Sequence, residues 1–342
     1  MSRLDEQLDQ GPVLIAEGYL FELERRGYLQ AGAFVPEVVL DHPEKVTELH
    51  QEFAHAGTDV VEAFTYYAHR EKLRIIGREA DLERINRQAL RLAADVAREH
   101  GLLLAGNICN TNVWDPDDPQ APARVRAMFE EQVQWAIDAG VDFVIAETFG
   151  DGEEAVLATR VIVEADLDAV TTMGIQQTGR TTEGWSVSEA LRRLADAGAR
   201  VVGLNCSRGP DQTLELLRQL TPGDWSSLPA VAAVPVPYRT TTQHPTFQSL
   251  RNGDQLAFPT ELDPHVLTRS EMARFAGEAA ELGVAYLGGC CGTAPHHIRA
   301  MAEALGRKPE ASRFSADMSK HAYLGTDPTL LQRNLELGRT TL

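Results

Sequence analysis

The chain has 342 residues, 43% of them hydrophobic, and a formal net charge of −18. A chain of this length and composition can bury a full core, and barrel folds commonly use more than about 200 residues as one domain. The negative charge, without any basic run, argues against a nucleic-acid partner. Acids among the first ten residues exclude a secretory signal there, and no apolar run reaches the roughly 20 residues of a membrane helix, which predicts a cytoplasmic protein without membrane association.

Short apolar runs rich in β-branched residues alternate along the chain with longer amphipathic stretches. This alternation is typical of βα units arranged around a parallel sheet. Eight such runs occur, at residues 13–16, 60–64, 102–106, 143–146, 169–173, 201–205, 230–234 and 285–288. We therefore predict an α/β fold in which eight parallel strands close into a (β/α)8 TIM barrel.

The segments between these runs predict helices, loops and an extension. Residues 125–139, 186–197 and 274–282 have helical patterns, and several such patterns end in an Ala-Gly or Leu-Gly pair, where glycine stops a helix. Residues 238–263, rich in Thr, Gln, Gly and Pro, predict an elaborated loop after the seventh strand, where loops often shape active sites. Without a low-complexity linker, residues 1–313 read as one barrel domain. Residues 314–342 then form a C-terminal extension with a helix at 329–337, a candidate contact in a homo-oligomer.

Four cysteines are too few for a disulfide framework in a chain of this length. In a reducing cytoplasm they can be buried thiols, metal ligands or a nucleophile. Cys109 stands alone after an apolar strand and fits a small buried side chain. Cys206 follows the sixth strand directly, and Cys290 with Cys291 ends the eighth, so all three belong at the carboxyl end of the barrel, where active sites lie. Only one strand separates these two positions, which lets the three thiols converge.

Three thiolates with a vacant fourth position describe a catalytic rather than a structural metal site. Sulfur ligands favour zinc among the common divalent ions, and a substrate thiol bound at the open position would lose its proton near neutral pH. The pattern therefore predicts Zn2+ as the cofactor, held by Cys206, Cys290 and Cys291, and a thiolate nucleophile supplied by the substrate.

These motifs also carry a family resemblance. Gly203-Leu204-Asn205-Cys206 and Gly288-Gly289-Cys290-Cys291-Gly292 resemble the zinc-ligand motifs of the homocysteine S-methyltransferase family. Residues 21–28 and 64–68 are similar to the betaine-homocysteine branch of that family. The resemblance covers nearly the whole barrel. It implies a zinc-dependent S-methyltransferase in which a quaternary ammonium donor such as a betaine methylates homocysteine to methionine, without folate or cobalamin.

The resemblance assigns roles to single positions. Glu147 matches the carboxylate that holds the amino group of homocysteine, and an acid directly after a buried strand faces the barrel mouth. Tyr67 matches the tyrosine that lies over the methyl donor, so we take Glu147 and Tyr67 as the catalytic candidates. Phe34 matches an aromatic residue against the ammonium group, and Tyr66 and Tyr19 are further members of a possible donor cage. Aromatic faces attract such cations by roughly 0.5 to 2 kcal/mol each.

The chain departs from the family pattern at three places. Ala16-Glu17-Gly18 stands where the family usually has Asp-Gly-Gly, so Glu17, from a shifted position, and Gly18 are the candidate acceptor contacts. Thr148 replaces a tyrosine that helps to bind the donor in the betaine enzymes, and Tyr66 replaces a phenylalanine. We therefore count Thr148 and Tyr66 among the candidate substrate-binding residues.

Direct transfer is the predicted mechanism: a thiolate attacks a methyl carbon in line with the departing amine or sulfide. One alternative keeps the zinc and the thiol but takes the methyl group from a sulfonium compound of the S-methylmethionine type or from a methyl-corrinoid protein. A more distant alternative is a barrel that binds zinc and a ligand without turnover. His296 and His297 follow Ala294-Pro295 and are expected to open the last helix of the barrel rather than to bind metal.

Overall fold

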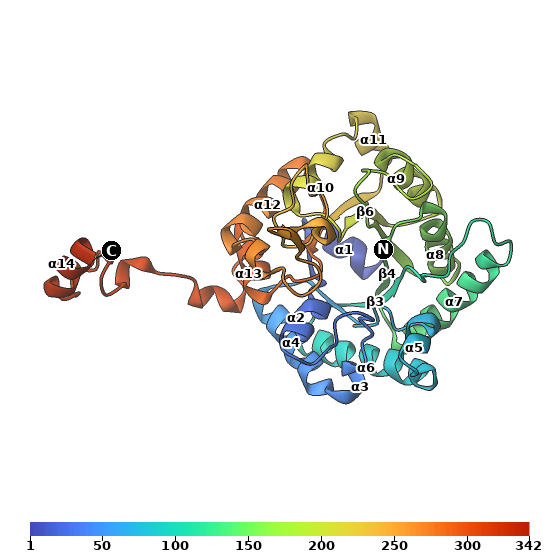
Figure 1. Cartoon of the computed structure of the whole chain (residues 1–342), viewed down its shortest axis with the longest axis horizontal. Coiled ribbons are helices and arrows are strands. Elements are labelled where there is room, and N and C mark those ends of the chain that lie inside the picture. The colour runs from blue at the N-terminus through green and yellow to red at the C-terminus, as the bar shows by residue number, and fades with distance from the viewer. Residues whose placement is uncertain (342) are drawn as a thin grey trace.

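The computed structural model describes residues 1–341 and contains the predicted eight-stranded barrel. The parallel sheet runs in the order β1-β10-β7-β6-β5-β4-β3-β2. Its strands are β1 (Val13–Ala16), β2 (Val60–Glu62), β3 (Leu103–Cys109), β4 (Phe143–Phe149), β5 (Asp168–Met173), β6 (Val201–Asn205), β7 (Ala230–Val234) and β10 (Tyr286–Gly289). The first and last strands of this order meet where the amide of Asp59 donates to the carbonyl of Leu14 at 2.7 Å. Figure 1 looks along the barrel, with the helices ringed around the strands.

Helices follow the strands and cover the outer face of the sheet (Figure 1). The amino-terminal half contains α1 (Arg3–Asp9), α2 (Tyr19–Arg25), α3 (Val38–Asp41), α4 (Pro43–Ala56), α5 (Arg70–Ile75), α6 (Leu82–His100), α7 (Ala121–Ala139) and α8 (Gly152–Glu164). The second half contains α9 (Val187–Asp196), α10 (Pro210–Leu217), α11 (Pro222–Ser227), α12 (Arg269–Leu282), α13 (Pro295–Ala304) and α14 (Gln332–Thr341). None of the helices within residues 1–341 has the length and apolar character that a membrane span requires.

The amino-terminal end of the barrel is covered by α1. Arg3 forms an ion pair with Asp142, just before β4, and Asp5 forms one with Arg200, just before β6. The buried side chain of Leu4 lies between these two ion pairs in the sequence. With this end covered, the carboxyl ends of the strands are the open face on which a site can form.

The predicted loop after the seventh strand is present and has structure of its own. It contains a short 3-10 helix, Phe247–Ser249, followed by a two-stranded antiparallel hairpin of β8 (Arg251–Asn252) and β9 (Gln255–Leu256). A second 3-10 helix, Asp263–His265, leads into α12. Phe247 and Leu250 are buried, which fixes the loop against the barrel.

Several predicted boundaries were wrong. Helix α7 begins at Ala121 rather than at residue 125, with a proline in its first turn, and α12 begins at Arg269 rather than at residue 274 because Thr268 and Glu271 form a capping box. The last helix, α14, begins at Gln332 and not at residue 329. Strands β3 and β4 continue past their predicted ends, to Cys109 and Phe149.

Candidate metal centre and substrate cavity

Three thiols meet at the open end of the barrel. Cys206 follows β6, and Cys290 with Cys291 follows β10. The sulfur of Cys291 lies 3.9 Å from that of Cys206 and 3.8 Å from that of Cys290, and all three sulfurs lie within 4.8 Å of one another. All three cysteines are buried and free. Tetrahedral zinc with Zn–S bonds of about 2.3 Å needs sulfurs about 3.8 Å apart, so the spacing fits the ion.

The end of β7 fixes the two cysteine segments relative to each other. The amide of Cys206 donates to the carbonyl of Val234 at 2.9 Å, and the amide of Cys290 donates to the carbonyl of Pro235 at 2.9 Å. Because β7 is paired to β6 on one side and to β10 on the other, these contacts continue the sheet up to the thiols. The convergence of the three sulfurs is therefore set by backbone pairing.

The protonation of the three thiols is unequal. Hydrogen bonds from Cys290 and Cys291 hold the pKa of Cys206 well below its usual range, whereas burial raises the pKa of Cys290. The pKa of Cys291 is also raised, first by its contact with Cys206. The arrangement therefore stabilises a thiolate at Cys206, and a cation between the sulfurs would favour the thiolate form of all three.

Three carboxylates lie beside the thiols in a small void of about 10 Å³. Glu17 and Glu147 each place a carboxylate oxygen within 4.8 Å of the sulfur of Cys290. Glu62 lines the same void, and the amide nitrogen of Asn107 donates to Glu62 at 2.5 Å and to Glu147 at 2.7 Å. One oxygen of Glu17, Oε2, is buried without a hydrogen-bond partner in the described chain. A buried acceptor of this kind calls for a donor that a ligand can bring.

Burial shifts the protonation of these acids. It raises the pKa of Glu147 to about 7, with the charge of Cys206 as the next cause. The pKa values of Glu17 and Glu62 are raised well above the usual range, in both cases by burial and then by the charge of Glu147. A cation entering the void would reverse these shifts, because it stabilises the ionised form of all three.

Asn205 connects the carboxylates with the metal centre. Its amide nitrogen donates to Glu147 at 2.7 Å and to the hydroxyl of Thr148 at 2.8 Å, and it lies 3.9 Å from the sulfur of Cys290. Its side-chain oxygen accepts from the amide of Thr148 at 2.9 Å. The last residue of β6 thus holds the end of β4 in place.

A cavity of about 600 Å³ opens above the thiols. Cys206 and Cys291 form part of its floor, and aromatic side chains from several loops make up much of its wall. The aromatic residues are Phe21, Phe34, Tyr66, Tyr67, Trp114, Phe247 and Phe258. The acids Asp151, Glu154 and Glu183 also line it, whereas no Lys, Arg or His does so among residues 1–341. Such walls suit a cation with apolar substituents.

Backbone strain is concentrated around this cavity. Seven non-glycine residues of the described chain have a positive φ, and six of these line the cavity. The six are Phe34, Tyr67, Asn112, Thr148, Cys206 and Ser207. Left-handed backbone costs about 1 to 3 kcal/mol at such residues and persists where surrounding structure enforces it, most often at functional sites.

The structure brings most of the predicted donor contacts together. Phe34, Tyr66, Tyr67 and Thr148 all line the large cavity. The ammonium of Lys72 lies 3.9 Å from the centre of the Tyr67 ring and so covers part of that ring. Tyr19 does not line the large cavity. It lies in the core beside the small void, with its hydroxyl 3.1 Å from Nδ1 of His50.

The residues predicted to contact the acceptor do not all lie at the site. Glu17 lines the small void, but Gly18 lines neither cavity and instead lies against the carbonyl of Thr293, where a β-carbon would stand 1.9 Å away. Glu147 was expected after the fourth strand and lies within it, because β4 continues to Phe149. Sequence reasoning missed Glu62 and Asn107. The signal for Glu62 was an acid that directly follows two valines of a buried strand.

Cys109 is a buried thiol, and His296 and His297 lie in the first turn of the last barrel helix, as the sequence predicts. Cys109 is buried and accepts a hydrogen bond from the amide of Tyr67 at 3.2 Å. His297 lies in the first turn of α13, where its Nδ1 accepts from the amide of Ala294 at 3.2 Å and its Nε2 lies 2.9 Å from the carbonyl of Leu267.

Comparison with known proteins finds relatives that are homocysteine methyltransferases. The chain is 35% identical over 331 residues to betaine–homocysteine S-methyltransferase 1 of Xenopus tropicalis, which covers 94% of this chain and 79% of that protein. It is 36% identical over 324 residues to S-methylmethionine–homocysteine S-methyltransferase BHMT2 of Pongo abelii, with 94% and 85% covered. The metallated crystal structure of the homocysteine methyltransferase MmuM from Escherichia coli superposes with a TM-score of 0.67, covering 88% of this chain and 99% of that one at 19% identity, and so supports the fold.

The family described as homocysteine S-methyltransferase matches residues 16–305, which span the barrel from the end of β1 to the end of α13. This range includes all three converging cysteines and the three carboxylates beside them. The chain therefore belongs to the homocysteine S-methyltransferase family.

Proposed function

We propose that this S-methyltransferase moves a methyl group from a quaternary ammonium donor such as a betaine to the thiol of homocysteine, giving methionine. The main support for this proposal is the position of three buried thiols, which lie at the floor of an aromatic cavity and border a void lined by acids. Thiols, acids and aromatic rings are the groups that a thiol acceptor with an amine and a cationic donor require.

Zinc is the metal that fits the proposal, held by Cys206, Cys290 and Cys291. The support is the sulfur spacing of 3.8 and 3.9 Å and the all-sulfur donor set. Zinc held there would keep the thiol of a bound acceptor in its thiolate form near neutral pH. The remaining chemistry is alignment by the chain's own side chains.

The acids beside the thiols bind the acceptor's amino group in this proposal. An ammonium ion offers three N–H donors, and Glu17 has a buried oxygen without a partner next to Cys290. Glu147 and Glu62 complete the void, and Asn107 and Asn205 hold Glu147 by hydrogen bonds of 2.7 Å each. The acceptor is thereby anchored with its sulfur beside the three cysteines.

The aromatic wall orients the donor. Phe34, Tyr66 and Tyr67 present ring faces or edges to the cavity above Cys206 and Cys291. The acceptor sulfur attacks the methyl carbon, a C–S bond forms, and the C–N bond breaks with its electron pair leaving on the neutral amine. Alignment of the acceptor sulfur with the methyl carbon by these side chains lowers the barrier.

A sulfonium donor of the S-methylmethionine type is the second candidate. It is favoured by the three acids of the cavity lining, Asp151, Glu154 and Glu183, because S-methylmethionine carries an α-ammonium group that can pair with them and a betaine does not. The two kinds of relative, at 35% and 36% identity, do not separate the donors.

The deciding experiment is an anaerobic assay of zinc-loaded protein with homocysteine and a panel of betaines and sulfonium compounds, read by mass spectrometry. Methionine formed from one donor class identifies both substrates. One zinc per chain without methionine from any donor would contradict the homocysteine assignment. A cytoplasmic location, inferred from the sequence, remains a prediction.

The metal centre has its own test. Cys290→Ala should abolish zinc binding and methyl transfer together, because two thiols cannot form the site. The matched control is Cys109→Ser, a change of another buried thiol, which lies outside the metal cluster. Retention of metal and transfer by Cys290→Ala would overturn the centre.

A further inference from the structure

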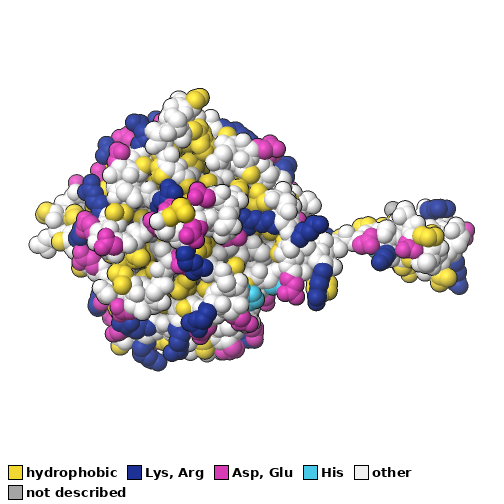
Figure 2. Space-filling model, turned by 180° about the vertical axis from the view of Figure 1, so that it is seen from behind, with side chains coloured by type: hydrophobic (Ala, Val, Ile, Leu, Met, Phe, Trp, Pro, Cys, Tyr) yellow, Lys and Arg dark blue, Asp and Glu magenta, His cyan; other side chains and the backbone are white. Residues whose placement is uncertain are grey.

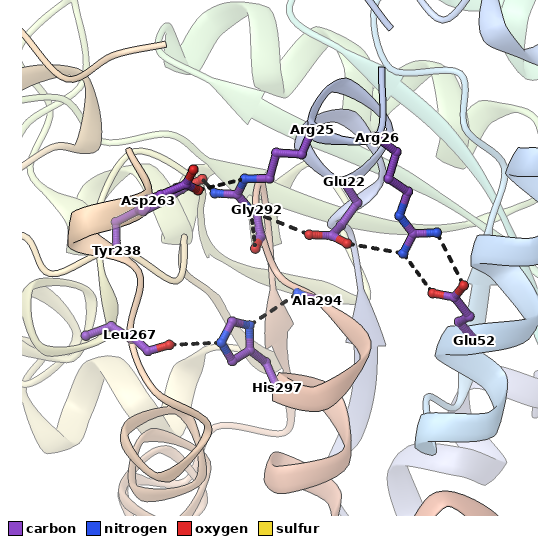
Figure 3. Close-up of polar contacts among 10 residues, drawn as sticks. All are labelled: Glu22, Arg25, Arg26, Glu52, Tyr238, Asp263, Leu267, Gly292, Ala294 and His297. Atoms are coloured by element: carbon purple, nitrogen blue, oxygen red, sulfur yellow. Dashed lines mark hydrogen bonds and ion pairs between the residues drawn. The ribbon is translucent and has the colours of Figure 1, made fainter. Parts of the chain in front are cut away.

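Helix α2 ends next to the turn that carries two of the cysteines. The guanidinium of Arg25, the last residue of α2, donates to the carbonyl of Gly292 at 3.4 Å and to the hydroxyl of Tyr238 at 2.8 Å. Its Nε lies 3.3 Å from the carboxylate of Asp263. Figure 3 shows these contacts, with Arg25 directed to Gly292 and the neighbouring Arg26 directed away to Glu52.

The carbonyl that Arg25 contacts belongs to the residue directly after Cys291. Gly292 has a φ of +88°, and a β-carbon at this position would stand 2.3 Å from the hydroxyl of Tyr238. The turn is closed by a hydrogen bond of 2.9 Å from the amide of Thr293 to the carbonyl of Cys290. Glycine, the tyrosine hydroxyl and the guanidinium therefore form one close-packed contact on this turn.

Tyr238 links the same turn with the rest of the site. Its ring is fully buried and stacks on the ring of Phe247, with centroids 5.7 Å apart and planes 3° from parallel. Phe247 lines the large cavity. The carbonyl of Tyr238 also lies so close to Gly209 that a β-carbon there would stand 2.1 Å away, three residues after Cys206. Tyr238 thus touches both cysteine segments and the cavity wall.

We propose that Arg25 is a positioning residue for the metal centre. Through Tyr238 and the carbonyl of Gly292 it fixes the turn of Cys290 and Cys291 against the cavity wall, so that retention of the metal depends on it. The inference rests on the zinc centre of the proposed function. Residues that orient metal ligands from outside the coordination sphere typically change metal affinity by about 10- to 100-fold when they are removed.

The test is the rate at which zinc-loaded protein loses its metal to an excess of a chromogenic chelator. Arg25→Met keeps an unbranched apolar stem but removes the guanidinium, and should release zinc roughly 10-fold faster or more. Arg25→Lys should behave like Arg25→Met, because a single ammonium cannot reproduce the planar fork that reaches two acceptors. The matched control is Arg26→Met, which removes the adjacent guanidinium and its contacts with Glu22 and Glu52 and should leave the rate unchanged.

A second variant separates positioning from general destabilisation. Tyr238→Phe removes only the hydroxyl that accepts from Arg25, and the double variant Arg25→Met/Tyr238→Phe should release zinc no faster than the faster single variant, because residues in one network are not additive. Thermal unfolding of the metal-free proteins should be similar for Arg25→Met and Arg26→Met. Zinc release from Arg25→Met at the wild-type rate, or equal acceleration in Arg26→Met, overturns the inference. Wild-type protein that binds no zinc would instead overturn the metal centre itself.

Discussion

At the scale of single residues, the small void holds three carboxylates without a positively charged partner among residues 1–341. Glu17, Glu62 and Glu147 are all buried, and no Lys, Arg or His lines the void with them in the described chain. Ionised carboxylates are costly to bury without a partner. Since Glu17 also has an unpartnered oxygen, an amine of the acceptor is the group whose arrival would stabilise the site.

Glu17→Gln should weaken the binding of the acceptor selectively. A hydrogen bond to a charged group contributes roughly 1.5 to 3 kcal/mol, so the KM for homocysteine should rise roughly 10- to 100-fold. The KM for the donor, which binds in the other cavity, should stay near the wild-type value. Steady-state kinetics with each substrate varied in turn measure both. A similar rise in both constants would show that Glu17 acts on the whole site and not on the acceptor.

The residues that hold the site could be predicted from the sequence only in part. Cys206, Cys290 and Cys291 were found because a parallel barrel brings strand ends together, which the order of the strands fixes. Glu62 belongs to the run 60–64 that predicts a strand, but all three residues of β2 are buried, so the run does not show which of them faces the site. The positive φ of Phe34 follows from tertiary packing, so no local pattern indicates it.

At the scale of elements, the barrel depends on close contact between β1 and β10, which are paired neighbours in the sheet. Gly288 of β10 pairs with Ile15 of β1, and a β-carbon on Gly288 would stand 2.0 Å from the carbonyl of Ile15. The contact leaves no room for a side chain, because the neighbouring atom is backbone and cannot rotate away. Cys290 follows directly after the same strand.

Gly288→Ala should therefore destabilise the fold by roughly 1 to 3 kcal/mol, the range for overpacked interiors. The matched control is Gly277→Ala within α12, where a β-carbon would meet nothing within 4 Å. Because alanine is the better helix former, that change should stabilise by up to about 1 kcal/mol. Urea unfolding measures both free energies. If Gly288→Ala unfolds at the wild-type midpoint, β1 and β10 can move apart to admit a side chain and their contact is looser than described.

The element boundaries show why local sequence patterns predict the order of the strands more reliably than the lengths of the strands. The eight predicted runs all overlap real strands, because β-branched apolar runs must be buried on both faces of a parallel sheet. The polar ends of β3 and β4, which include Asn107 and Glu147, have no such signal. They are strand because they pair with each other in register, Asn107 opposite Ile145 and Cys109 opposite Glu147.

At the scale of the whole molecule, buried histidines make stability depend on pH. His50 of α4 is fully buried, and burial lowers its pKa to about 3. An unfolded histidine has a pKa of about 6.5, so between pH 6.5 and pH 3 the unfolded chain binds a proton that the folded chain does not. The stability associated with neutral His50 is complete above pH 6.5 and falls as the pH decreases, by about 2 kcal/mol at pH 5.

His50→Gln should remove that dependence. The loss of unfolding free energy between pH 7 and pH 5 should be about 2 kcal/mol smaller in the variant than in the wild type. Glu17 and Glu62, whose pKa values are raised, act in the opposite direction, but they are common to both proteins and cancel in the comparison. Urea unfolding at the two pH values is the measurement, with His100→Gln at the exposed end of α6 as control. Equal pH dependence in His50→Gln and wild type would contradict the assignment.

The C-terminal extension gives the molecule its outline. Residues 314–341 run away from the ring of helices in Figure 1, and Figure 2 shows this arm clear of the barrel from the opposite side, with apolar side chains on it. Ten large apolar residues among residues 1–341 are exposed, and six of them lie in residues 314–341. The six are Phe314, Met318, Tyr323, Leu324, Leu331 and Leu337. We propose that this arm is a contact in a homo-oligomer, because exposed apolar patches of this kind mark interaction surfaces.

Replacing apolar residues of the arm should then lower the molecular mass in solution. Leu331 and Leu337 are 70% and 49% exposed, so Leu331→Glu/Leu337→Glu removes apolar surface without disturbing the core of the barrel. Gln332→Glu/Thr340→Glu adds the same charge at polar positions of α14, the helix that contains Leu337 and directly follows Leu331, and should leave the mass unchanged. Light scattering coupled to size exclusion measures each mass. A wild-type protein that is already monomeric would contradict the proposed contact, and equal dissociation by both double variants would assign the effect to charge, not to the apolar face of the arm.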